Sequence, residues 1–136
     1  MNLQERISVC VELGKKLSSE ILNNQRLLVK STGANGWFTE DEVERALINW
    51  SDALSADKIE KWLSDYPELT AYKAKNRVGI IMAGNIPLVG LHDLISVFLS
   101  GNVAVVKMSS DDEVLMSEVI MQLLQLDERV GDYIEV

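Results

Sequence analysis

Cysteine, proline and basic residues are all scarce in this sequence. Its 136 residues include one cysteine, Cys10, and two prolines. A single cysteine excludes an internal disulfide and any metal site built from several cysteines, and it suits a reducing compartment. Thirteen basic residues stand against 21 acidic ones, which gives a net charge of −8. Because nucleic-acid binding relies on neutralising phosphates with Lys and Arg, this balance argues against that class of function.

Long hydrophobic runs are lacking as well. The most apolar stretch, residues 86–99, is shorter than the ~20 residues that a membrane span needs, and it contains His92 and Asp93. Glu5 and Arg6 lie in an amphipathic N-terminal pattern that is unlike a secretory signal peptide. With 47% hydrophobic and 25% charged residues, the composition is typical of a folded domain. We therefore expect a cytoplasmic protein without a membrane span.

Apolar residues at helical spacing dominate the first half of the chain. They recur over residues 3–22, and Cys10 lies on that stripe. Because the thiol lies on this apolar stripe, we interpret it as a small core residue rather than a nucleophile. The three tryptophans, Trp37, Trp50 and Trp62, are likewise interpreted as core anchors in preference to a ligand-stacking surface.

Two further helices are expected before residue 70. Thr39 and Glu42 have the spacing of a capping box at the start of one helix. The next helix is expected to begin near residues 55–57 and to stop at Pro67. Between the first two helices, residues 31–36 have the composition of a loop. The side chains expected to be buried in these two helices are Val43, Leu47, Trp50, Leu54, Ile59, Trp62, Leu63 and Tyr66.

The second half of the chain has the pattern of an α/β unit. Residues 78–83 and 103–106 are short Val- and Ile-rich runs bounded by glycine, which predicts buried strands. The apolar segment 87–100 is long enough to be a crossover helix, so the two strands are expected to be parallel. A capping box over residues 110–113 predicts another helix, and residues 133–136 resemble the start of a third strand. Pro87 is expected in the first turn of the crossover helix and Gly101 at its C-terminus.

These elements define the expected fold class and its boundaries. The fold is predicted to be α/β, with an N-terminal helical subdomain (1–70) followed by an incomplete parallel βαβαβ, Rossmann-like unit (71–136). A basic connector, residues 72–77, links the two parts. A strand begun at the last residues, with no helix after it, predicts a fragment of a longer protein. Its open strand edge and uncovered apolar face predict a homo-oligomer.

Two loops carry the candidate chemistry. Gly79 and Gly84 have the spacing of a phosphate loop, but Asn85 and Ile86 stand where Lys and Ser or Thr are required, which excludes a nucleoside triphosphate loop. No G-x-G-x-x-G fingerprint follows either strand. The loops after the two strands should still share the carboxyl edge of the sheet, where open α/β sheets bind ligands and helix N-termini present amides.

Each candidate residue in these loops has two interpretations. Asn85 is either a turn residue or helix cap, which the residue alone favours, or an amide donor to a developing oxyanion. Lys107 either extends to solvent from the end of its strand or binds a ribose or phosphate. Ser110 is either a helix N-cap or a contact to the same ribose or phosphate.

Taken together, the two loops resemble the first cofactor-binding unit of the aldehyde dehydrogenase superfamily. The resemblance rests on residues 83–87, a helix, residues 99–107 and then Ser109 and Ser110. It is closer to the luminescence-type (LuxC-like) acyl-CoA reductases, which keep the G-N-x-P and K-x-S-S forms, and it covers residues 78–126. By position, the resemblance implies that Asn85 is the oxyanion-hole amide. It implies a cofactor site that includes Lys107 at the adenosine ribose, Ser109, Ser110, Ile86 and Pro87.

The chain departs from the superfamily pattern at three of these positions. Gly84 replaces an aromatic residue, and Met108 replaces a proline. Ser110 replaces an acidic residue that often binds the ribose 2′-hydroxyl. Because a carboxylate there would repel a 2′-phosphate and a hydroxyl beside Lys107 would accept one, the resemblance favours NADPH, with NADH as the alternative.

The resemblance implies the N-terminal portion of an NAD(P)-dependent acyl-CoA reductase of the EC 1.2.1 type. Such an enzyme converts a fatty acyl-CoA into a fatty aldehyde through an acyl-cysteine intermediate on a separate catalytic domain. Its expected partners are an acyl-CoA or acyl-enzyme substrate and an acyl-transferring protein, and this portion alone should be inactive. The alternative is a non-catalytic α/β module that binds a nucleotide or a partner protein, which the lack of a nucleophile–base pair supports.

Overall fold

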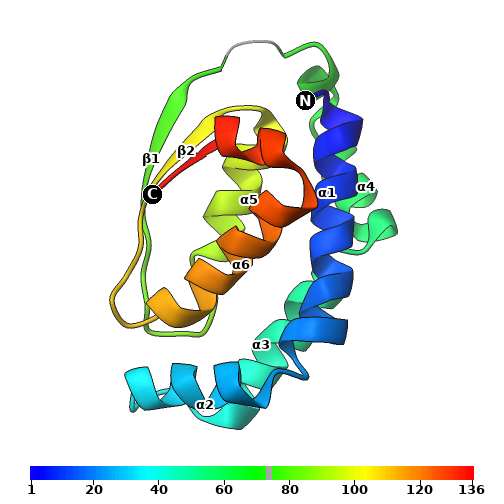
Figure 1. The fold of residues 1–136 in the computed structure, drawn as a ribbon. Helices are drawn as coiled ribbons and strands as arrows, with labels where there is room; N and C mark the ends of the chain where they lie inside the picture. The colour runs from blue at the N-terminus through cyan, green and yellow to red at the C-terminus, as the bar shows by residue number, and fades with distance from the viewer. Residues whose placement is uncertain (73–74) are drawn as a thin grey trace.

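The computed structural model describes residues 1–72 and 75–136, and it has an α/β architecture (Figure 1). The predicted connector 72–77 includes residues 73–74, which lie outside the described residues. In the described part, six α-helices and three short helical segments accompany three strands. Their bounds are α1 Leu3–Lys16, η1 Leu17–Ile21, α2 Gln25–Ala34, α3 Glu40–Ala53, α4 Ala56–Leu63, η2 Pro67–Thr70, β1 Arg77–Ile81, α5 Leu91–Ser100, β2 Val103–Lys107, α6 Glu113–Leu126, η3 Glu128–Asp132 and β3 Ile134–Glu135.

The sheet confirms the predicted parallel strands. Its order is β1-β2-β3, and both neighbouring pairs are parallel. Figure 1 shows α5 and α6 on one side of the sheet, with α1 beyond them, so helices form two layers over this face. No helix of the described residues lies over the opposite face, where Ile81 is 84% exposed. This arrangement is consistent with a partial Rossmann-like unit.

The N-terminal helices partly confirm the sequence predictions. The capping box between Thr39 and Glu42 is present at the start of α3. Contrary to the predicted loop over residues 31–36, α2 continues to Ala34. Leu27 and Leu28 of that helix are buried. The hydroxyls that suggested a loop donate back to the carbonyl of Leu28 and so remain compatible with a helix.

The aromatic residues are less buried than the sequence predicts. Trp37 is 88% exposed and Tyr66 is 47% exposed, so the prediction that both lie in the core is wrong. Trp37 lies in the connection before α3 and Tyr66 follows the end of α4, so neither residue belongs to the apolar face of a helix. Trp50 and Trp62 are half-buried and pack against the core.

The crossover helix differs from the prediction at its start. α5 begins at Leu91 rather than near Pro87, because Leu88 adopts a left-handed conformation with φ +58° that no right-handed helix can contain. Its other end is as predicted. Gly101, with φ +83°, forms the left-handed C-cap.

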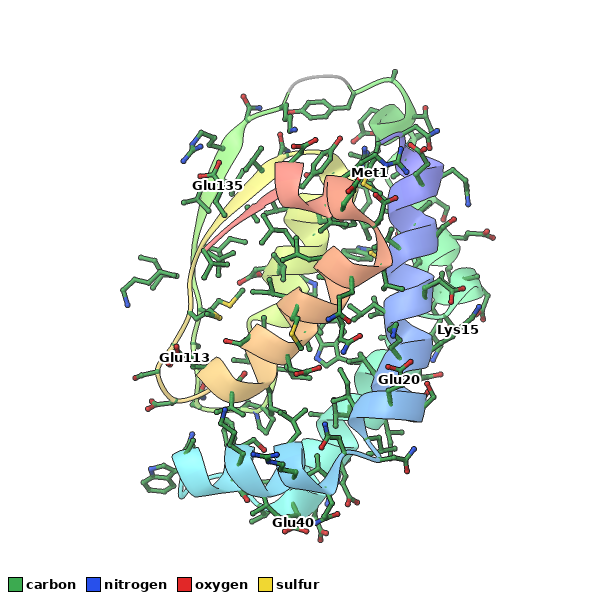
Figure 2. The ribbon with its side chains drawn as sticks, in the orientation of Figure 1. Met1, Lys15, Glu20, Glu40, Glu113 and Glu135 are labelled. Atoms are coloured by element: carbon green, nitrogen blue, oxygen red, sulfur yellow. The ribbon has the colours of Figure 1, made fainter. Side chains whose placement is uncertain are left out.

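A buried arginine joins the two ends of the chain to the α/β unit. Arg6 on α1 is 5% exposed and donates from Nε and Nη2 to the carbonyl of Leu99, near the C-terminus of α5. Its Nη1 donates to the carbonyl of Met1 at 2.7 Å. The guanidinium also lies 5.9 Å from the ring centroid of Tyr133. Figure 2 shows the side chains that fill the space between α1, α5 and α6 in this part of the molecule.

None of the helices in the described residues is long and apolar enough to cross a bilayer.

We predict that Arg6→Ala lowers the free energy of unfolding by roughly 1–3 kcal/mol, because it removes hydrogen bonds from a charged donor to buried carbonyls. Urea denaturation measures this change. Arg26→Ala, at an exposed position on α2, is the matched control and should change stability little. Equal effects of the two substitutions would contradict the structural role of Arg6.

Candidate functional site

The ends of β1 and β2 meet at one edge of the sheet. Ile81, the last residue of β1, pairs with Lys107, the last residue of β2. The amide of Met82 then donates to the carbonyl of Lys107 at 3.0 Å. The loops that follow, residues 82–90 and 108–112, therefore leave the same edge, as expected for parallel strands (Figure 1).

Asn85 lies in the bend of the first loop. It is exposed, and its side-chain amide makes no hydrogen bond within the described residues. It does not cap α5, because the N-cap position there belongs to Gly90. Asn85, Ile86 and Pro87 line a cavity of about 230 Å³, whose other walls are Trp37, Phe38, Glu42, Arg45, Ala46 and Asn49.

The residues of the second loop are spread around its corner. Lys107 is exposed at the end of β2, and the Ser109 hydroxyl accepts a hydrogen bond from the Asp111 amide at 3.3 Å. Ser110 lines a cavity of about 410 Å³ between α2 and α6, and neither Lys107 nor Ser109 lines it. The structure thus places the predicted residues on one edge, with Asn85 and Ser110 in different cavities.

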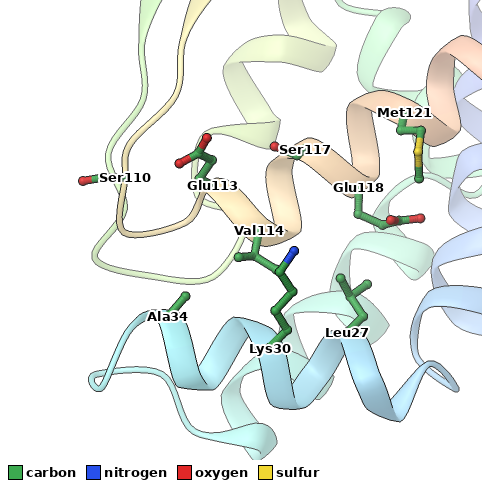
Figure 3. Close-up of a pocket in the computed structure, with 9 residues that line it drawn as sticks. All are labelled: Leu27, Lys30, Ala34, Ser110, Glu113, Val114, Ser117, Glu118 and Met121. Atoms are coloured by element: carbon green, nitrogen blue, oxygen red, sulfur yellow. The ribbon is translucent and has the colours of Figure 1, made fainter.

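The charge of the cavity beside Ser110 limits what it can bind. Lys30 reaches into it from α2, while Glu113 and Glu118 contribute carboxylates from α6 (Figure 3). In that view the Ser110 hydroxyl points away from Lys30 and from α6. Because two carboxylates oppose one ammonium, this cavity disfavours a phosphate group.

The two loops approach each other closely at Gly84. A Cβ at that position would lie 2.3 Å from the Ser109 Oγ, 2.8 Å from the Ser109 Cβ and 2.9 Å from the Asp111 Cβ. No real side chain tolerates such distances without a shift of its neighbours. Gly84 is therefore the residue that lets the second loop pack against the first.

Asn35, which follows the last residue of α2, forms hydrogen bonds to both loops. This buried residue at the end of α2 donates from Nδ2 to the carbonyl of Gly84 at 3.4 Å and to the carbonyl of Asp111 at 3.1 Å. Its Oδ1 accepts a hydrogen bond from the Trp37 amide at 2.9 Å. Sequence reasoning missed Asn35, because within its own segment it is one more polar loop residue.

Asp112 makes a third connection between the loops. Its Oδ2 accepts a hydrogen bond from the Leu88 amide at 2.7 Å. The predicted capping box over residues 110–113 is wrong, because α6 begins at Glu113 with Asp112 as N-cap and without a side-chain cap. Burial raises the pKa of the Asp112 carboxyl to about 7, although the bond from Leu88 favours its charged form.

Cys10 is the core residue that the sequence predicts. Its thiol is fully buried on α1, and burial raises its pKa to about 12. A thiol with that pKa is almost entirely protonated at neutral pH and is therefore a poor nucleophile. Residues 1–72 and 75–136 also contain no cluster of His, Cys, Asp or Glu that could hold a metal ion.

A parallel strand–helix–strand unit with two adjoining loops at its carboxyl edge is the ligand-binding arrangement of open α/β proteins. The comparison with known families is more specific. The family model described as acyl-CoA reductase (LuxC) matches residues 10–136. The chain belongs to this family of acyl-CoA reductases, as the resemblance of its two loops predicts. No curated protein and no solved structure matches it.

We predict that Gly84→Ala destabilises the protein by about 1–3 kcal/mol, because the added methyl group forces the two loops apart. Gly79→Ala on β1 is the matched control. A Cβ there meets no atom within 4 Å, so this change should be neutral or slightly stabilising. Thermal denaturation of the two variants compares these effects, and equal stability of both would refute the close packing at Gly84.

Proposed function

We propose that this chain is the N-terminal, cofactor-binding portion of an NADPH-dependent acyl-CoA reductase that produces fatty aldehydes. The observation that carries the proposal is the pairing of Ile81 with Lys107 in a member of the acyl-CoA reductase family. This register brings the loop that contains Asn85 to the same sheet edge as Lys107. The division into a helical part, 1–70, and an α/β part, 71–136, belongs to the same proposal.

The donor set at this edge fits a nicotinamide dinucleotide. Lys107 offers an exposed ammonium group, and Ser109 and Ser110 offer hydroxyls on the next turn of chain. An ammonium and hydroxyls are suitable partners for a ribose and for a 2′-phosphate, so we propose NADPH as the preferred cofactor and NADH as the alternative. Ile86 and Pro87 would complete the contact surface from the first loop. The bound cofactor supplies the hydride for reduction.

Asn85 has the chemistry of an oxyanion donor in this proposal. Its amide is exposed, lines a cavity and has no competing hydrogen bond in the described part of the chain. A preformed N–H donor at the reacting carbonyl lowers the barrier, because negative charge develops on that oxygen in the transition state.

The acyl-accepting cysteine is not supplied by these residues. Cys10 is the one cysteine of the sequence, and its buried thiol with a pKa of about 12 cannot serve. We propose that residues outside this sequence provide the nucleophile on a separate catalytic domain, so that the chain alone is inactive. The same observation supports the alternative, a non-catalytic α/β module that binds a nucleotide or a partner protein.

The expected assembly follows from the open face of the sheet. Ile81 is 84% exposed on that face, beside Lys107 in the neighbouring strand. The exposed Ile81 and an unpaired strand edge favour association, so we propose a homo-oligomer. An acyl-transferring partner protein belongs to the proposal as well, because the family resemblance implies one. A cytoplasmic location suits the single unpaired thiol.

We predict that Asn85→Ala in the reductase that contains this chain lowers kcat by roughly 10²–10³-fold, because one oxyanion donor is lost. Steady-state kinetics with an acyl-CoA measure the effect, and NADPH affinity should change far less. Asn23→Ala, an exposed asparagine in the connection before α2, is the control. Unchanged turnover in Asn85→Ala would exclude the oxyanion role.

We predict that Lys107→Ala weakens NADPH binding by roughly 10–100-fold, because a charged hydrogen-bond donor to the cofactor is removed. Calorimetric titration of the chain itself measures this, without any need for activity. Lys15→Ala, an exposed lysine on α1, is the control. A second variant, Ser110→Glu, should weaken binding of NADPH more than binding of NADH. Unaltered affinity in Lys107→Ala would remove this residue from the site.

A further inference from the structure

Asp112 is buried and directs its side chain away from its own helix. It is 3% exposed and occupies the N-cap position of α6, where Asp commonly accepts bonds from the first amides of the helix. Here it makes no such bond and instead accepts the amide of Leu88, 24 residues earlier in the chain. Asp112 therefore does not cap α6 with its side chain, and it connects the two loops instead.

The partner of this bond has an unusual backbone conformation. Leu88 has φ +58°, and it is the one non-glycine residue with positive φ in the described part of the chain. A left-handed conformation costs an L-residue roughly 1–2 kcal/mol, and it persists only where the surroundings impose it. The Leu88 side chain is fully buried, and its backbone amide donates a hydrogen bond to Asp112. Packing therefore fixes the side chain, and the hydrogen bond fixes the backbone.

The left-handed turn at Leu88 determines the path of the first loop. It interrupts the right-handed helical path at residue 88, and α5 begins only at Leu91. Asn85 lies three residues before this turn. A change of φ at Leu88 would therefore rotate the segment that carries the Asn85 amide relative to the second loop.

Stability alone does not account for Asp112. Its Oδ1 is buried and has no hydrogen-bond partner among the described residues. A buried carboxylate with one unpartnered oxygen costs stability that a capping serine would not cost. Strained or costly arrangements of this kind concentrate at functional sites, and this one connects the two loops of the candidate site.

We propose that Asp112 is a positioning residue that holds Leu88 in its left-handed conformation and thereby fixes Asn85 relative to the cofactor loop. The proposal rests on the proposed function, because it assigns Asp112 to the placement of the oxyanion donor. Because Asp112 is 3% exposed, it acts through Leu88 rather than by contact with substrate or cofactor.

The test compares three variants of the reductase that contains this chain. Asp112→Ser can cap α6 with its hydroxyl but is too short to reach Leu88, so the protein should stay folded while kcat falls roughly 10²-fold. The KM for the acyl-CoA should change little. Asp112→Asn retains an acceptor oxygen and should restore most of the turnover. Asp65→Ser, at an exposed aspartate after α4 and far from both loops in the sequence, is the control and should resemble the unmodified enzyme.

A double-mutant cycle separates this inference from the proposed function. If Asp112 acts through Asn85, adding Asp112→Ser to Asn85→Ala should lower kcat little further. Additive losses would overturn the positioning role and leave the oxyanion role of Asn85 intact. An Asn85→Ala enzyme with unchanged kcat would overturn both.

Hydrogen exchange of the Leu88 amide in the folded chain tests the bond itself. The amide should be protected in the unmodified chain and in Asp112→Asn, and should exchange faster in Asp112→Ser. Equal exchange rates in all three would show that Asp112 does not hold Leu88 and would overturn the proposal.

Discussion

The contact between the loops after β1 and β2 is the constraint on which the candidate site depends. Parallel pairing of Ile81 with Lys107 brings the loops to one edge, but it does not fix the distance between them or their orientation. Those are fixed by the close approach at Gly84 and by the bond from the Leu88 amide to Asp112. Because both contacts are buried or sterically tight, small shifts in one loop are transmitted to the other.

The N-terminal helices contribute to this geometry from a distance in sequence. Asn35 at the end of α2 donates to backbone carbonyls in both loops, so the helical part of the chain holds the edge of the sheet in place. A loop edge held by three independent contacts is better organised for catalysis than one that depends on strand pairing alone, because the donors need not reorganise when charge develops. Gly84 is part of the same arrangement, since only a residue without Cβ permits the contact between the loops.

The sequence predicted those elements whose signals are local. Apolar runs bounded by glycine identified both paired strands, Gly101 identified the end of α5, and Thr39 with Glu42 identified the start of α3. It could not predict Asn35, whose acceptors lie 49 and 76 residues away, nor that Asp112 would bond Leu88 instead of capping α6. Both failures have the same physical cause, which is a side-chain hydrogen bond to a residue far away in the sequence.

The two sequence interpretations of Asn85 can now be weighed on geometry. A helix cap must lie at the first turn of its helix, but the left-handed turn at Leu88 moves the start of α5 to Leu91, six residues beyond Asn85. Asn85 lies in a bend, which agrees with a turn residue. A side chain that stabilises a turn usually bonds a nearby backbone group, but the amide of Asn85 makes no such bond in residues 1–72 or 75–136. Asn85 is therefore an exposed donor on a loop whose backbone is held by buried contacts, and its amide is free to bond an acceptor from outside the chain. Under the proposed function, that acceptor is the carbonyl oxygen that gains negative charge during reduction.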